Sequence, residues 1–69
     1  MEEVFKIRLK EELSHSGMSM NELARCIGVT PEMVTQYFTT KKMPRLDTFT
    51  KICKALDVSA DYLLGLTNL

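Results

Sequence analysis

The sequence contains few of the residues that build catalytic or metal sites. Its 69 residues include one histidine, two cysteines, three glycines and no tryptophan. Cys26 and Cys53 do not have the spacing of metal ligands, and His15 alone cannot complete a tetrahedral site with them. No serine or cysteine nucleophile has a histidine within reach, and no glycine-rich loop is present that could hold a phosphate. We therefore expect no metal, no cofactor and no enzymatic activity.

The chain also lacks long apolar runs. No stretch has the length of a transmembrane span or the apolar centre of a secretory leader, so the sequence predicts a cytoplasmic protein with no membrane partner. Two free thiols fit a reducing compartment, and Cys53 is expected to be a small buried residue beside Ile52. At this length, residues 1–69 have room for a single domain with one modest core.

Charge is balanced over the whole chain but not along it. Nine acidic and nine basic residues give a net charge of zero, which is unusual for a protein that binds nucleic acid. Residues 35–54 nevertheless carry a net charge of +4, because five basic residues stand against Asp47 alone. A polarised molecule can present one basic face to phosphates, although such lysines also occur on ordinary solvated surfaces. The basic residues are Lys41, Lys42, Arg45, Lys51 and Lys54.

Apolar residues recur at helical spacing in five segments, and no segment alternates like a strand. The first helix is expected at about residues 2–15, with Phe5, Leu9 and Leu13 on its buried face. The fourth is expected at 46–56, and the fifth follows Ser59 and ends at Gly65. Short loops between the helices favour a compact all-α bundle of five helices. The fourth helix is expected to bury Leu46, Phe49, Ile52, Cys53 and Leu56.

The second and third expected helices have the spacing of a helix-turn-helix, at about residues 20–39. Ser19 begins a capping box before the second helix, while Thr30 caps the third. Ala24 supplies the small residue that two steeply crossing helices need where they touch. Gly28 tolerates the positive φ at which the chain leaves the second helix. The apolar side chains expected to face the shared core are Leu23, Ile27, Val34 and Tyr37.

These segments resemble the Cro and phage-repressor helix-turn-helix family, also called the XRE family, over essentially the whole chain. Arg8 also stands where this family commonly has an arginine in its first helix. The resemblance implies a lambda-repressor-like DNA-binding fold whose third helix enters the major groove while the second crosses the backbone. The resemblance is carried by Gly17-Met18-Ser19, Asn21-Glu22-Leu23-Ala24, Ile27-Gly28-Val29-Thr30, Val34, Tyr37, Pro44, Leu56-Asp57-Val58-Ser59 and Asp61-Tyr62-Leu63-Leu64-Gly65.

Carried over position by position, the resemblance implies two sets of contacts with double-stranded DNA. Within the base-facing set, Gln36 can pair with the N6 and N7 edge of adenine, and Glu32 can accept a hydrogen bond from cytosine N4. The candidates for base contact are Thr30, Pro31, Glu32, Thr35 and Gln36. The candidates for phosphate contact are Ser19 and Asn21, through their amides and side chains at a helix N-terminus, with Lys41, Lys42 and Arg45.

Three residues depart from the family pattern. Met20 stands where the family often has a glutamine that supports the backbone contact. Phe38 stands where a glutamate is usual, so an ion pair to the first helix is expected to be missing. Thr40 stands where glycine is common, and holding a threonine at positive φ would cost about 1–2 kcal/mol, so we expect the loop to take another path. These changes leave the fold intact but affect the expected phosphate geometry.

Two functions remain open at this point. The first is a sequence-specific transcriptional regulator, a repressor that acts as a homodimer on a pseudo-palindromic operator. The second is a protein-interaction module with the same fold, of the anti-repressor or antitoxin kind, which the zero net charge, Met20 and Glu32 favour. The chain could also be the head of a longer regulator, and no pocket for a small-molecule effector is evident. The candidates for the dimer contact are Leu64, Leu66 and Leu69.

Overall fold

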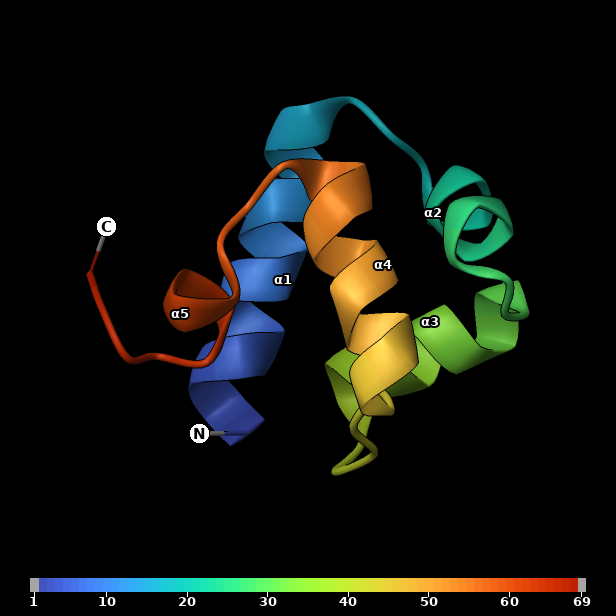
Figure 1. Cartoon of the computed structure of the whole chain (residues 1–69). Helices are drawn as coiled ribbons and strands as arrows, with labels where there is room; N and C mark the ends of the chain where they lie inside the picture. The colour runs from blue at the N-terminus through green and yellow to red at the C-terminus, as the bar shows by residue number, and fades with distance from the viewer. Residues whose placement is uncertain (1, 69) are drawn as a thin grey trace.

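The computed structural model describes residues 2–68, which form five helices joined by short loops (Figure 1). No strand occurs in this part of the chain, which confirms the all-α class. None of its helices combines the length and apolar character that a membrane crossing requires. The helices agree with the expected segments to within about two residues at each end. They are α1 (Glu2–Ser16), α2 (Met20–Ile27), α3 (Pro31–Thr39), α4 (Leu46–Leu56) and α5 (Ala60–Leu63).

The first helix lies at the centre of the bundle. It contacts α3, α4 and α5, while α2 packs against both α3 and α4. Figure 1 shows α1 and α4 near the middle of the molecule, with α2 and α3 on one side and α5 on the other. This arrangement leaves one face of the α2–α3 pair directed away from the bundle.

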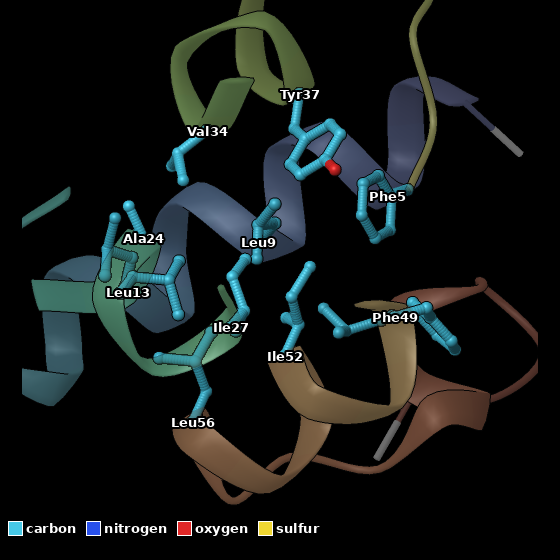
Figure 2. Packing of buried hydrophobic residues seen from close by; sticks show 12 residues of the cluster. Phe5, Leu9, Leu13, Ala24, Ile27, Val34, Tyr37, Phe49, Ile52 and Leu56 are labelled. Atoms are coloured by element: carbon cyan, nitrogen blue, oxygen red, sulfur yellow. The ribbon is translucent and has the colours of Figure 1, made fainter. Parts of the chain in front are cut away.

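The core is built from side chains of all five helices. Phe5, Leu9 and Leu13 of α1 are buried as expected, and side chains of α2, α3 and α4 point toward the same interior (Figure 2). The rings of Phe5 and Phe49 pack in a tilted arrangement with their centroids 6.0 Å apart, a geometry that aromatic pairs favour. Leu63 of α5 is fully buried and joins this cluster. One contiguous core therefore fixes the positions of all five helices.

Two predictions for α4 were wrong. Leu46 is 82% exposed and Cys53 is only half-buried. The buried side of this helix is centred on Thr48, Phe49, Ile52 and Leu56, and successive residues turn by about 100°. Both mispredicted residues therefore point about 80–100° away from the centre of the buried side. The apolar pattern of this helix does not reveal the burial of Thr48, which lies on the buried side in the structure.

The loops leave the helices as their end residues predict. Gly28 ends α2 with φ at 74°, and Thr40 avoids positive φ, as expected, by adopting extended backbone with φ at −125°. Gly65 also has a positive φ of 79°, and a Cβ added there would lie 3.0 Å from a methyl carbon of Val4. The chain after α5 is thus held closely against α1.

Asp57 ends α4 with φ at 53°, in the left-handed region that disfavours side chains. Its carboxylate also lies at the negative end of the helix dipole. We expect Asp57→Gly to raise the free energy of unfolding by about 0.5–1 kcal/mol, because relief of strain and charge exceeds the extra entropy of glycine in the unfolded chain. Urea denaturation measures this change. Asp57→Asn, which removes only the charge, should give a smaller gain, and a loss of stability in both variants would contradict the interpretation.

Candidate nucleic-acid interface

The α2–α3 pair has the geometry of a helix-turn-helix. Ala24, at the crossing, is 1% exposed, and its carbonyl accepts a hydrogen bond of 3.0 Å from the Val29 amide in the turn. On α3, the buried side chains of Val34 and Tyr37 attach the helix to the core (Figure 2). Because these contacts occupy one side of each helix, the opposite side of α3 faces solvent.

All five candidates for base contact lie exposed on α3 or directly before it. Since residues 31, 32, 35 and 36 fall within about 140° of one another around the helix, they share the face opposite Val34 and Tyr37. This face therefore forms one continuous polar surface over the first half of α3. Its members are Thr30, Pro31, Glu32, Thr35 and Gln36.

Hydrogen bonds within the chain already engage part of this surface. The Thr30 hydroxyl accepts a bond from the Met33 amide at 3.2 Å as the helix cap. The Thr35 hydroxyl lies 3.2 Å from the Pro31 carbonyl and 3.9 Å from the Met20 sulfur, so its single proton is directed inward. Within residues 2–68, no hydrogen bond or ion pair engages the side chains of Glu32 or Gln36. Gln36 thus keeps its donors and its acceptor for a partner outside the chain.

The capping box of α2 changes the expected phosphate site at this helix. The Ser19 amide donates to the Glu22 carboxylate at 2.9 Å, and the Glu22 amide donates to the Ser19 hydroxyl at 3.1 Å. The Ser19 amide is therefore engaged within the chain, and a phosphate contact through this amide would have to replace its bond to Glu22. Its hydroxyl proton and the exposed Asn21 side chain remain available, but the Glu22 carboxylate adds a negative charge beside them.

The capping box makes stability depend on pH. The pKa of Glu22 is lowered, first because the Ser19 backbone amide donates to its carboxylate and second by the bond to the Ser19 side chain. A lowered folded-state pKa stabilises the fold above the unfolded value of about 4.5, and this contribution disappears as pH falls through the folded pKa. We expect Glu22→Gln to lose stability at pH 7 and to approach the wild type near pH 3.

Urea denaturation at both pH values tests this expectation. Glu11→Gln, an exposed change on α1 outside the capping box, controls for the general effect of removing one acid. The interpretation fails when both variants show the same dependence on pH.

A basic loop follows the C-terminal end of α3. Lys41, Lys42 and Arg45 are exposed there. Thr40 holds the loop against the helix, because its hydroxyl donates to the Gln36 carbonyl at 2.8 Å and accepts from the Lys42 amide at 3.1 Å. The Arg45 side chain lies 3.7 Å from the Asp47 carboxylate, so part of its charge is already compensated. The two lysines are thus the stronger cationic positions of this loop.

Two basic residues of α1 hold this architecture in ways that the sequence did not reveal. The Lys6 amine donates to the Tyr37 carbonyl at 2.9 Å, near the C-terminal end of α3. The Arg8 guanidinium donates to the carbonyls of Tyr62 and Thr67, each at 2.7 Å, and lies 4.3 Å from the centroid of the Tyr62 ring. Arg8 had been singled out only by the resemblance, and no local pattern marks Lys6. Lys6 positions the candidate reading helix against α1.

The two described residues of the expected dimer contact, Leu64 and Leu66, differ in their exposure. Leu64 is half-buried and packs against the core of its own chain. Leu66 is 73% exposed, and Leu69 lies outside the described residues. Of the two described residues, Leu66 is therefore the one that is exposed for a contact between copies.

Known proteins resemble this chain in sequence and in structure. The helix-turn-helix family profile matches residues 9–63. An uncharacterised HTH-type transcriptional regulator of Bacillus subtilis, YobD, is 34% identical over 61 residues, covering 88% of this chain and 54% of its own length. The SPbeta prophage-derived uncharacterised regulator YonR of the same organism is 36% identical over 65 residues, covering 94% of this chain and 60% of its own. The chain thus spans little more than half the length of these relatives.

A solved structure supports the fold. The clp gene regulator ClgR of Corynebacterium glutamicum superposes with a TM-score of 0.83 at 22% identity, covering 93% of this chain and 68% of that one. This likeness bears on the arrangement of the helices alone. The profile and the two sequence relatives show that the chain belongs to the XRE-type helix-turn-helix family.

Proposed function

We propose that this chain is the sequence-specific DNA-binding part of a transcriptional regulator and that α3 reads bases in the major groove. The observation that carries the proposal is the exposed polar face of α3. On this face the side-chain amide of Gln36 forms no hydrogen bond within residues 2–68. A glutamine in this position can form a bidentate pair with adenine. Lys41 and Lys42 follow directly at the end of the helix, where they can contact phosphates.

We further propose that two copies act together as a repressor on a pseudo-palindromic operator. One such helix reads few base pairs, and two copies related by a two-fold axis would place two reading helices one DNA turn apart, about 34 Å. The exposed Leu66 would contribute apolar surface to the contact between the copies. Repression is the role that the resemblance to phage repressors favours.

Selection of bound duplexes from a random DNA pool, at near-physiological salt, tests this proposal. We expect enrichment of a palindrome whose half-site centres lie about ten base pairs apart. Gln36→Ala should reduce the preference for adenine at one position of each half-site by about 1–3 kcal/mol. Enrichment of an unpaired half-site would overturn the dimer, and no enrichment would overturn sequence reading.

A second candidate function is the recognition of another protein through the same surface. The observation that favours it is the pair of exposed carboxylates, Glu22 and Glu32, in the first turns of α2 and α3. These charges would repel DNA phosphates but would attract a basic partner surface. Weak DNA binding without sequence preference, which disappears as salt rises, would favour this function over the first.

A further inference from the structure

An open apolar groove lies between the C-terminal half of α1, the start of α2 and α3. Its volume is about 600 Å³, which falls within the range of small-molecule sites in proteins. The side chains of Leu13, Met18, Met20 and Phe38 supply its apolar lining. Thr35 also lines the groove and belongs to the exposed face of α3. The groove therefore borders the surface that is proposed to read DNA.

Two of the four apolar residues that line the groove depart from the family pattern. Met20 and Phe38 replace the glutamine and glutamate that the resemblance leads one to expect, and both line this groove. With the usual residues, an amide and a carboxylate would border the same space. The two departures, which lie 18 positions apart in the sequence, thus converge on one place in the fold.

One charge accompanies this apolar lining. Within residues 2–68, Lys10 is the only charged residue that lines the groove, and no hydrogen bond or ion pair engages its amine. Lys10 is exposed, so its flexible side chain can place the amine at the rim. An apolar surface with one free cation at its edge is complementary to a molecule with an apolar body and one negative charge.

We propose that this groove binds a small anion with an apolar body, such as a medium-chain carboxylate. Its carboxylate would pair with the Lys10 amine, and its hydrocarbon would cover Met20 and Phe38. The Thr35 hydroxyl lies 3.9 Å from the Met20 sulfur, so a ligand on Met20 would adjoin the reading face of α3. A bound ligand would therefore weaken operator binding, a consequence that rests on the proposed function.

Titration of the full chain with decanoate, followed by the NMR shifts of backbone amides, tests the site without DNA. We expect saturable shifts at Gly17, Met18 and Phe38. Lys10→Gln should weaken decanoate binding about fivefold, in line with an exposed ion pair. The matched control, Lys54→Gln, removes an exposed lysine of α4 that does not line the groove and should bind as the wild type does.

Two further probes make the site falsifiable. Phe38→Glu places a carboxylate in the groove and should abolish decanoate binding, with the fold checked by circular dichroism. Decyltrimethylammonium carries the same chain with a positive charge and should bind more weakly than decanoate. Shifts that do not saturate, that lie away from the groove, or that are equal for both amphiphiles would overturn the proposed site.

The regulatory consequence is tested separately on the selected operator. Saturating decanoate should weaken operator binding at least threefold in the wild type, and the effect at the same concentration should shrink in Lys10→Gln. Binding of decanoate without this competition would overturn the regulatory role. Decanoate binding by a chain that selects no DNA would support the groove site and overturn the proposed function. Selection of an operator by a chain that does not bind decanoate would support the proposed function and overturn the groove site.

Discussion

Replacing both Lys41 and Lys42 by glutamine is expected to weaken DNA binding about 60-fold at 0.1 M monovalent salt. Each phosphate that a lysine neutralises contributes about 0.9 to the slope of log K against log salt, so losing two contacts reduces the slope by about 1.8. With equal affinities at 1 M salt as the reference, lowering the salt tenfold to 0.1 M leaves the variant about 60-fold weaker than the wild type. Both lysines are exposed just after α3, and Thr40 bonds this part of the loop to the helix.

Fluorescence anisotropy with a labelled operator, between 50 and 300 mM potassium chloride, measures both the affinity and the slope. Base preference should be unchanged, because phosphate contacts carry no direct sequence information. The matched control removes the same charge from α4 by replacing Lys51 and Lys54, which are also exposed. Equal losses in the two double variants would show that DNA senses only the net charge of the protein, and an unchanged slope would remove the loop from the interface.

The features that the sequence predicted correctly depend on short-range chemistry. Ser19 and Thr30 cap their helices through bonds to amides three residues later, and Gly28 adopts the positive φ that ends α2. Each of these interactions is completed within a few residues, so the order of residue types is sufficient to predict it. The exposed face of α3 could be predicted for the same reason, because about half a helical turn separates it from Val34 and Tyr37.

The features that the sequence missed depend on contacts between distant segments. Leu46 and Cys53 fit a helical stripe, but the direction from which α1 and α2 approach α4 decides which side is buried. Lys6 reaches a carbonyl 31 residues away, and nothing near Lys6 in the sequence indicates that partner. The groove bordered by Met20 and Phe38 exists only where three helices meet. The departures at these two positions were visible in the sequence, but their proximity was not.

Arg8→Met is expected to lower the free energy of unfolding by about 2–3 kcal/mol. The guanidinium donates two bonds of 2.7 Å to backbone carbonyls of Tyr62 and Thr67 and lies over the Tyr62 ring. A hydrogen bond to a charged group contributes about 1.5–3 kcal/mol and a cation–π contact about 0.5–2 kcal/mol, and these terms are not additive. In a domain of this size, 1 kcal/mol corresponds to about 4–8 °C, so the melting temperature should fall by about 8–24 °C.

Thermal denaturation at one fixed protein concentration measures this loss, because any dimerisation would make the melting temperature depend on concentration. Lys51→Met, an exposed change on α4, should stay within about 0.5 kcal/mol of the wild type. Arg8→Lys keeps the charge but not the planar fork, so it should recover only part of the stability. Because Arg8 holds the segment that carries Leu66 against α1, Arg8→Met should also increase amide exchange after Tyr62 before the whole domain unfolds. An unchanged exchange pattern with a lowered melting temperature would place the contribution of Arg8 in general packing and not in holding this segment.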